Sequence, residues 1–569
     1  MSTSTATAKA KQPAWIKPNN ERPPPVVQLL NSMTRTKTPL VPRAGKQLTW
    51  YNCGPTVYDV SHMGHARLYV TIDVLRRVLE DYFKYDILFI ILRARQNYLF
   101  DQLKGRVDQL TTNLIVQVNT AFAIFASSKL GKLDASLADE AGAFAAWEAF
   151  AKKASVASNV PGAADEPKFP MYLSAANAAY HAIRAAEAAL KAGQTDKAAA
   201  DQLLDGARDV LTPWLDAEHG SEVTQPEIFR NLAAHWEGEF MKDMAALNVR
   251  PCDVLTRVSE YVPEIVAYVE RIIANGYGYE ADGSVYFDTR AFDGHDGHHY
   301  AKLEPWSAGS TALIEEGEGS LGAKLGGKRN NADFALWKKS KPGEPAWDSP
   351  WGRGRPGWHI ECSVMASEVL GSNMDIHSGG IDLAFPHHDN ELAQSEAYHK
   401  CAQWVNYFLH PGHLHIEGQK MSKSLKNFVS IQEALQKYTA RQLRFYFLLQ
   451  QWDGPLDFKE SGMEAVRSAE KTFGNFFSNV SAYVEEWRAV ALESDGTHLY
   501  KASEQELMNL LLEKQMAVHN ALADSIDTPT VIRELLELVN RANVYVAGSS
   551  RPYVPVLEKI ARYIVSIFK

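Results

Sequence analysis

Apolar and polar positions change their period twice within residues 48–91. The apolar run at residues 48–51 is typical of a buried strand, and residues 66–83 show the spacing of an amphipathic helix. A second apolar run follows at residues 86–91. A strand, a helix and a strand in this order predict one half of a parallel nucleotide-binding sheet.

The other half of this sheet is predicted much later in the chain. Strand-like runs at residues 374–376 and 405–409 flank a helix that starts near His387. We therefore expect an α/β fold with a Rossmann-type parallel sheet, built from residues 45–95 and 237–430.

The remaining segments have other patterns. Residues 96–236 are alanine-rich with helical spacing and no motif, so they predict a large helical insertion. Residues 431–569 are nearly all helical in pattern and predict a C-terminal bundle, with a helix start at Asp527-Thr528-Pro529. Residues 1–44 are polar and interrupted by prolines, so we expect a disordered tail.

Composition limits the class of protein. The chain has 569 residues and 46% hydrophobic content, enough for several domains with large cores. The sequence contains no run of about 18 apolar residues, so a membrane span is not expected. The first 20 residues contain neither acids nor arginine, which supports a mitochondrial transit peptide only weakly, and a cytoplasmic location is expected.

Charge and cysteine content add two constraints. The net charge of −9 gives no general attraction to nucleic acid, so any RNA contact needs local basic patches. Four cysteines argue against a disulfide framework and for a reducing compartment.

Residues 62–67 read HMGHAR and follow the first predicted strand through a turn at Cys53-Gly54-Pro55. They stand where the predicted helix begins, so free backbone N–H groups and the helix dipole are expected to attract phosphate. Gly64 lets a nucleotide approach the backbone, and His62 and His65 can donate to phosphate oxygens. An ordinary histidine pair at a helix start is the alternative.

Residues 420–424 read KMSKS, and Lys420, Lys423 and Lys426 lie in a short polar loop between apolar segments. Such lysines suit a pyrophosphate leaving group that must be held in the transition state. Taken alone, the segment is also consistent with a solvated basic loop. Both motifs in one chain, in this order, indicate nucleotide activation.

Four further segments narrow this interpretation. They are YNCGPTVYD at 51–59, GWHIECS at 357–363, GGIDLAFPHHDNE at 379–391 and WDGPLDF at 452–458. With the two motifs above, they make the chain resemble the class I aminoacyl-tRNA synthetases, and more narrowly the cysteinyl-tRNA synthetases of eukaryotic cytosolic type.

Cys53, Cys362, His387 and Glu391 offer two thiolates, an imidazole and a carboxylate, a set that zinc accepts. His387 and Glu391 are spaced to share one helix face. By spacing alone, structural roles are the alternative. The resemblance implies that all four bind one Zn²⁺, which is expected to recognise the substrate thiol and so to make an editing domain unnecessary.

The resemblance also implies the surroundings of the substrates. Trp358 would form a wall of the amino-acid pocket, with a core tryptophan as the alternative. Gly380 and Asp382 stand where class I enzymes contact the ATP ribose, and Gly54 and Gly64 are expected beside the nucleotide. His388 is left open between supporting the metal ligands and facing ATP.

The implied reaction ligates L-cysteine to tRNA(Cys). The cysteine carboxylate attacks the α-phosphate of ATP, while His62, His65, Lys420 and Lys423 stabilise the phosphates as catalytic residues and Mg²⁺ accompanies the nucleotide. The acyl group then moves to the terminal ribose of the tRNA. Catalysis would be mostly positioning and electrostatics, and the oligomeric state stays open.

The chain departs from the family in two places. Residues 86–98 read DILFIILRARQNY, so the Asn-x-Thr-Asp-x-Asp-Asp-Lys segment of the family is missing. About ten residues are thus absent after Ile90, at the sheet edge where ligands bind in such folds. The helical region also stops at Lys569, where the family continues into an anticodon-reading domain, so weakened anticodon recognition is expected.

Two other functions therefore stay open. One is a catalytically impaired synthetase-like protein that binds RNA, which the missing segment would explain. The other is a cysteine ligase that uses a small amine as its acceptor, although the long helical C-terminal region disfavours it.

Overall fold

The computed structural model describes residues 25–57, 60–95, 103–104, 107–155, 159–163, 166, 169–219, 226–311, 313–314, 326–341, 344–416, 419–420, 428–491 and 498–569. Within these ranges, no helix combines the length and the apolar composition that crossing a bilayer requires.

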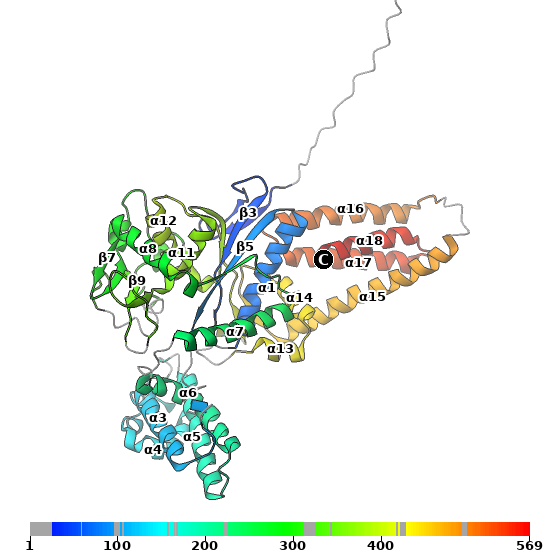
Figure 1. Cartoon of the computed structure of the whole chain (residues 1–569). Coiled ribbons are helices and arrows are strands. Elements are labelled where there is room, and N and C mark those ends of the chain that lie inside the picture. The colour runs from blue at the N-terminus through cyan, green and yellow to red at the C-terminus, as the bar shows by residue number, and fades with distance from the viewer. Residues whose placement is uncertain are drawn as a thin grey trace, which may run out of the picture.

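A parallel sheet forms the centre of the molecule (Figure 1). Its main strands run in the order β12 (Val405–Leu409), β11 (Met374–Ser378), β3 (Gln47–Asn52) and β5 (Asp86–Arg95), and all of these pairs are parallel. Two short strands, β4 (Thr56–Val57) and β6 (Val254–Arg257), also pair in parallel with β5. The prediction of an α/β fold with a Rossmann-type sheet is confirmed.

The direction of the strand order reverses between β3 and β11. From β3 the chain moves outward to β5, whereas from β11 it moves outward to β12 on the other side. The carboxyl ends of β3 and β11 lie side by side, because Tyr51 pairs with His377 and Asn52 pairs with Ser378. In open parallel sheets such a reversal is where ligands bind.

Helices connect and cover the strands. The helix α1 (Met63–Arg77) continues into a wider turn at Val78–Tyr82 and leads from β3 to β5. The helices α11 (Trp358–Leu370) and α12 (Asp389–His399) pack on each other and share a buried cluster with β12, and α8 (Val262–Ala274) packs against both. A 3₁₀ turn at Ile381–Leu383 and a wider turn at Ala384–His388 lead from β11 into α12.

Two smaller sheets accompany the central one. An antiparallel sheet has the order β10 (Gly354–Pro356), β9 (Phe334–Lys339), β8 (Ser284–Phe287) and β7 (Gly278–Ala281), followed in the chain after β8 by the short helix α9 (Thr289–Phe292). The second has β13 (Leu414–Ile416) between β14 (Gln419–Lys420) and β15 (Leu456–Phe458). Further 3₁₀ turns lie at Ala135–Leu137, Val258–Glu260 and Pro305–Ser307.

Among the described residues, the alanine-rich region contains a group of long helices with a core of their own. They are α3 (Thr112–Leu130), α4 (Glu140–Ala154), α5 (Phe169–Lys191) and α6 (Lys197–His219), and they lie apart from the central sheet in Figure 1. Phe122, Trp147 and Ile183 are fully buried in their core. The next helix, α7 (Pro226–Ala246), packs against β4 and β5 instead, so the domain boundary expected at residue 236 falls inside a helix that contacts the sheet.

The prediction that residues 1–44 form a disordered tail is wrong for its last part. Residues 1–24 lie outside the described part, but β1 (Gln28–Asn31) and β2 (Thr36–Pro39) form an antiparallel hairpin. Val27, Leu29 and Leu40 are buried in the main core. Apolar side chains on one face of this short ribbon hold it on the protein despite its polar and proline-containing sequence.

The C-terminal region is a helical bundle. Its helices are α13 (Ile431–Lys437), α14 (Ala440–Leu448), α15 (Glu460–Ala491), α16 (Ala502–Ala523), α17 (Thr528–Gly548) and α18 (Val554–Phe568). Asp527 caps α17 by accepting from the backbone N–H of Thr530, as its sequence predicts. The region is not entirely helical, because β15 interrupts it and pairs in parallel with β13.

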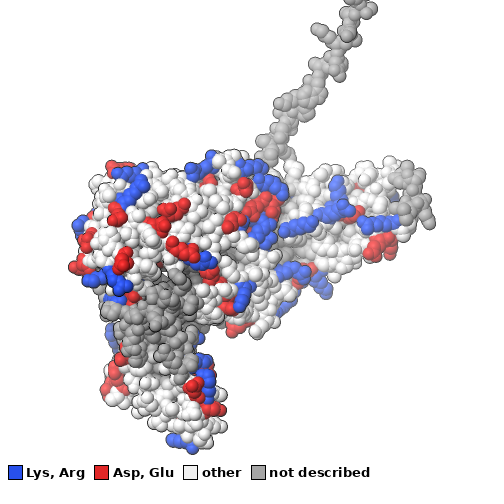
Figure 2. All heavy atoms as spheres, viewed as in Figure 1, with Lys and Arg blue, Asp and Glu red and all other residues white. Residues whose placement is uncertain are grey.

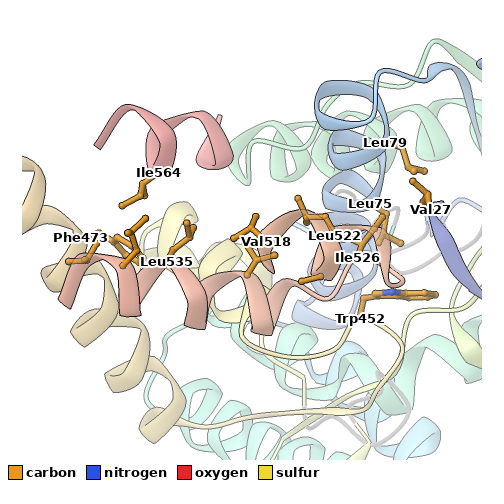
Figure 3. Close-up of a cluster of buried hydrophobic side chains, with 14 of the residues drawn as sticks. Val27, Leu75, Leu79, Trp452, Phe473, Val518, Leu522, Ile526, Leu535 and Ile564 are labelled. Atoms are coloured by element: carbon orange, nitrogen blue, oxygen red, sulfur yellow. The ribbon is translucent and has the colours of Figure 1, made fainter. Parts of the chain in front are cut away.

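The core of the bundle is continuous with the core under the sheet. Figure 3 shows Leu75 of α1, Leu79 of the wider turn after it and Val27 of the N-terminal segment in the same buried cluster as Trp452, Leu522 and Ile526. Burying these side chains together fixes the position of the bundle relative to α1.

Arg67 adds a polar link between α1 and the bundle. Its side chain is 1% exposed, and its guanidinium donates to the carbonyl oxygens of Phe447 at 3.3 Å, Gln451 at 2.8 Å and Trp452 at 3.2 Å. Burial lowers the pKa of Arg67 to about 10, against the opposing charge of Asp453, so the group stays charged at neutral pH. It thereby satisfies carbonyls near the end of α14, where the helix dipole is negative.

Replacing Arg67 with leucine should destabilise this junction by about 3 kcal/mol, because buried carbonyls lose a charged donor. The urea midpoint of unfolding, followed by circular dichroism, measures the loss. Arg441→Leu on α14 is the matched control, since the Arg441 side chain is 79% exposed and its surface ion pair with Glu470 contributes at most about 1 kcal/mol. Equal midpoints for the two variants would contradict the role assigned to Arg67.

Candidate functional site

Polar side chains converge where β3 and β11 end. The indole N–H of Trp50 donates to Ser378 Oγ at 2.7 Å, and Ser378 Oγ donates to Asn52 Oδ1 at 2.7 Å. The backbone N–H of Cys53 donates to the carbonyl of Ser378 at 2.9 Å, so the parallel ladder extends one residue beyond β3. This network fixes Cys53 at the floor of the predicted ligand site.

The four residues of the predicted metal site meet at this point. Cys53 follows β3, and Cys362 lies on α11. His387 lies in the wider turn Ala384–His388, and Glu391 lies in the first turn of α12. All four are buried, and one ligand atom of each lies within 4.8 Å of those of the others. The cluster therefore has the donors, the proximity and the exclusion of water that a metal site requires.

The separate distances describe a compact cluster. The two sulfur atoms are 3.7 Å apart, and Cys53 Sγ lies 3.5 Å from Glu391 Oε1. His387 Nε2 lies 3.3 Å from Cys362 Sγ and 2.9 Å from Glu391 Oε1. The i, i+4 spacing of His387 and Glu391 does direct both side chains to one point.

Burial and mutual charge shift the pKa values within the cluster. Burial raises the pKa of Cys53, and Cys362 raises it further. Burial lowers the pKa of His387, but the charges of Cys362 and Glu391 outweigh it and raise this pKa to about 10. Burial raises the pKa of Glu391, but His377 and His387 lower it to about 2.

The pKa of Cys362 is shifted in the opposite direction from that of Cys53. Burial raises the pKa of Cys362, but the hydrogen bond from Cys53 and the charge of His387 lower it overall. The pKa values of the two thiols are thus shifted in opposite directions by their mutual contact. Two sulfur atoms, an imidazole and a carboxylate at contact distance are a donor set for a divalent cation.

Further histidines orient the cluster. His359 Nδ1 and His387 Nδ1 are 3.0 Å apart, and His377 Nε2 lies 2.8 Å from Glu391 Oε2. Contacts of this kind fix the orientation of metal ligands. Sequence reasoning missed both, although His359 precedes Cys362 by one helical turn within GWHIECS, and that spacing could have revealed it.

Trp358 is half-buried and contacts the cluster directly. Its ring stacks on His387 with centroids 4.6 Å apart and an interplanar angle of 24°. This places the indole beside the metal site and not in a separate core, so it can form a wall of a pocket next to the cluster.

The HMGHAR segment has an unexpected hydrogen-bond pattern. His62 caps α1, and its Nδ1 accepts from the backbone N–H of Gly64 at 3.2 Å and of His65 at 3.4 Å. The backbone N–H of Met63 donates to the carbonyl of Val429 at 2.9 Å. The expectation of free N–H groups for phosphate is therefore wrong at these positions, because the protein itself accepts from all three.

The two imidazoles contact each other and the backbone of this segment. His65 Nδ1 accepts from the backbone N–H of His62 at 3.3 Å, and the two rings stack with centroids 3.9 Å apart. Since each Nδ1 is an acceptor, each neutral ring carries its proton on Nε2. Donation from the Nε2 atoms of His62 and His65 to phosphate stays a prediction of the motif.

Described residues that follow the KMSKS segment contact the start of HMGHAR. Lys420 ends β14, and the backbone of His62 bridges that of Ser430 just after the segment. The backbone carbonyl of Val429 accepts from the N–H of Met63, and the carbonyl of Ser61 accepts from the N–H of Ile431. Lys423, Lys426 and the side chain of Lys420 lie outside the described part of the chain, so their contacts stay predictions.

The remaining predicted positions lie along the same sheet edge. Gly54 follows Cys53, and Gly64 lies in the first turn of α1. Gly380 begins the 3₁₀ turn after β11, and the Asp382 carboxylate on it is 53% exposed, with Oδ1 3.9 Å from His413 Nδ1. The exposed carboxylate at the end of β11 is available to a ligand in the crevice.

Comparison with known proteins identifies a family. Residues 39–468 match the family model described as the tRNA synthetases class I (C) catalytic domain. The cytoplasmic cysteine–tRNA ligases of Xenopus tropicalis and Gallus gallus are 45% and 46% identical to this chain, over 98% and 99% of it and 73% of each relative. A solved methionyl-tRNA synthetase of Mycobacterium tuberculosis, in complex with methionyl-adenylate, is 12% identical with a TM-score of 0.48, and the match covers 92% of this chain and 90% of that one.

The family model spans most of the chain, and the relatives are similar over nearly all of it. The chain therefore belongs to the cysteinyl-tRNA synthetases of class I, of the eukaryotic cytosolic type.

Proposed function

We propose that this chain ligates L-cysteine to tRNA(Cys) through cysteinyl-adenylate, with zinc recognising the thiol of the amino acid. The observation that carries the proposal is the buried cluster of Cys53, Cys362, His387 and Glu391 at the ligand edge of the sheet, in a member of this family. The names of the relatives support the same activity and a cytoplasmic location.

The donor set of the cluster suits zinc. Two cysteine sulfurs, an imidazole and a carboxylate are all common ligands of this ion, and a fully buried site protects them from oxidation and hydration. When bound, zinc would supply a position at which the substrate thiol binds as a thiolate. The hydroxyl of serine is a much weaker ligand at neutral pH, so selection needs no editing step.

The residues of the cluster and its surroundings would orient the amino acid. Trp358 stacks on His387 and would form the wall next to the substrate. His359 and His377 hold the orientations of His387 and Glu391, so the ligand atoms need no rearrangement on loading.

The adenylation step would use the two nucleotide motifs. His62 and His65 would donate from Nε2 to the phosphates, and Lys420 and Lys423 would hold the departing pyrophosphate. Asp382 beside Gly380 would accept from the ribose hydroxyls, Gly54 and Gly64 would leave room for the nucleotide, and Mg²⁺ would accompany ATP. Acyl transfer to the terminal ribose of the tRNA would follow without a covalent enzyme intermediate.

The tRNA would be held by the helical region over residues 431–569. Figure 2 shows basic and acidic side chains interspersed over the visible face, in agreement with a net charge of −9. Binding would therefore depend on local groups of basic residues and be sensitive to salt.

The missing segment after Ile90 is the feature that favours an impaired enzyme. The strand β5 continues to Arg95, and its last residues pair with β4. The sequence Arg93-Ala94-Arg95 is thus part of a strand.

The purified chain should catalyse cysteine-dependent ATP/pyrophosphate exchange and charge tRNA(Cys), because both substrate sites lie on one sheet edge. Exchange and aminoacylation assays test this, with serine as the alternative amino acid and a sugar amine as the alternative acceptor. Transfer to the sugar amine alone would support the small-acceptor ligase. Tight tRNA binding without any exchange would support the impaired protein.

Cys362→Ser should lower exchange by more than about 100-fold, beyond the loss typical of outer partners of a metal, whereas Cys401→Ser is a matched control outside the cluster.

Loading the metal-free protein with zinc should release protons at neutral pH. The raised pKa of Cys53 keeps its thiol protonated without metal, whereas coordination requires the thiolate. Between pH 6 and pH 8, the affinity for zinc should therefore increase about tenfold per pH unit for each proton that is released. Calorimetric titration in two buffers of different ionisation enthalpy counts the protons, and an identical heat in both buffers would exclude the release.

His62→Asn should separate helix capping from catalysis. An asparagine side chain can still accept from the N–H groups of Gly64 and His65, but it lacks a donor in the place of Nε2. We expect His62→Asn to lower exchange about 100-fold. Its melting temperature should be lowered less than that of His62→Ala, because the cap is kept. If His62→Asn retained full activity, the Nε2 atom would have no part in the reaction.

A further inference from the structure

The WDGPLDF segment has a structural partner at the ligand edge of the sheet. The loop at residues 411–413 follows β12, and the backbone N–H of Gly412 donates to the carbonyl of Trp452 at 3.0 Å. The backbone N–H of Leu456 donates to the carbonyl of His413 at 2.9 Å. Directly after these contacts, β13 and β15 pair in parallel. The segment therefore supports the chain from the end of β12 to the end of β13.

Gly412 allows this contact because it has no side chain. A Cβ on Gly412 would overlap the carbonyl group of Gly454 and lie 2.8 Å from the carbonyl oxygen of Asp453, whereas ordinary contact of a Cβ begins at 3.4 Å. The opposite position is different, since a Cβ on Gly454 would lie 3.8 Å from its nearest neighbour, the carbonyl oxygen of Gln451. Of these two glycines, only Gly412 is therefore required by the close approach of the two backbones.

The 452–454 side of the contact is fixed by the rest of the protein. The carbonyl of Trp452 also accepts from the guanidinium of Arg67 at 3.2 Å, and its indole N–H donates to the carbonyl of Ser525 at 2.8 Å. Trp452 is 5% exposed and belongs to the main core (Figure 3). A side chain at position 412 would therefore displace its own loop, and not the segment on which the loop packs.

The loop at residues 411–413 also holds the turn that carries Asp382. The backbone N–H of Ile381 donates to the carbonyl of Pro411 at 3.3 Å. His413 Nδ1 lies 3.9 Å from Asp382 Oδ1. Both contacts come from the loop itself, so a displacement of the loop changes the position of the Asp382 carboxylate.

The same loop leads into the strands before the KMSKS segment. Strand β13 begins at Leu414, directly after the loop, and pairs with β14, which ends at Lys420. The loop thus lies between the two parts of the structure that the proposed function assigns to the ribose and to the pyrophosphate of ATP.

We propose that Gly412 is a positioning residue for ATP, which acts through Asp382 and through the pair of β13 and β14. The packing of its backbone on residues 452–454 holds the ribose and pyrophosphate sites at a fixed distance, as a substrate oriented for reaction requires. The inference rests on the proposed function and gives the WDGPLDF segment a role in it, as the support of the nucleotide site.

Loss of this packing should affect ATP more than the amino acid, because the metal cluster is built on other elements. In the exchange assay on the full chain, Gly412→Ala should lower kcat/KM for ATP about 100-fold, the loss that a misplacement of about 1 Å can cause. The KM for ATP should rise, whereas the KM for cysteine should stay close to its original value. A variant that only lowers the amount of folded enzyme would lower kcat and leave both KM values constant.

Two matched variants make this specific. Gly454→Ala adds a methyl group on the other side of the same contact, where there is room, and should change neither KM. Gly206→Ala places a Cβ 2.6 Å from that of Ala182 within the helical insertion, so it should lower the melting temperature and leave the KM for ATP constant. An unchanged KM for ATP in Gly412→Ala, or an equal increase in Gly206→Ala, would overturn the proposal.

A second measurement does not depend on catalysis. Calorimetric titration of the full chain with ATP and Mg²⁺, without cysteine, gives the Kd for the nucleotide. We expect a higher Kd in Gly412→Ala and the original Kd in Gly454→Ala. Equal Kd values in the original chain and in Gly412→Ala would disprove the positioning role even in an active enzyme.

The titration also separates this inference from the proposed function. If the original chain bound ATP more tightly than Gly412→Ala but showed no exchange, the proposed function alone would be disproved. If the original chain bound no ATP, both would be overturned.

Discussion

The parallel pairing of β3 with β11 is the constraint on which the site depends. It brings the end of an early strand next to the end of a late one, and the N–H of Cys53 continues their ladder by one residue. The Asp375 carboxylate secures the opposite end of the same pair by accepting from the backbone and hydroxyl of Thr49. A slip of one residue would turn every side chain of β3 to the other face and remove Cys53 from α11 and α12.

The interior next to this pairing is unusually polar. Five histidines, two thiols and a carboxylate are buried together there: His359, His377, His387, His388, His410, Cys53, Cys362 and Glu391. Burying such groups is unfavourable unless each finds a partner, and several find one only in another member of the cluster. Stability is given up at this place in return for a fixed arrangement of ligand atoms, as is common at functional sites.

Sequence reasoning found the parts of the site that local spacing determines. The i, i+4 spacing of His387 and Glu391, the strand before Cys53 and the helix after HMGHAR all follow from residue types and short periods. The fold class followed from the order of these elements. By contrast, the hairpin at residues 28–39 was missed, because only a few apolar side chains stand among its polar and proline residues and tertiary packing decides its conformation.

Other features could not follow from the chain alone. Whether His62 caps its own helix depends on a side-chain rotamer, and the contact of Ser32 with His410 depends on how the hairpin lies on β12. The strand β15 has three residues and forms because β13 is available as a partner. The positions of Lys423 and of the ligands themselves remain expectations of the family motifs.

The helical insertion has a different relation to the rest of the protein. Among the described residues, the buried cluster of α3 to α6 contains no side chain that also belongs to the cores of the sheet or the bundle. A substitution within that cluster therefore acts first on the packing of its own side chains, and not on that of the residues around β3 and β11.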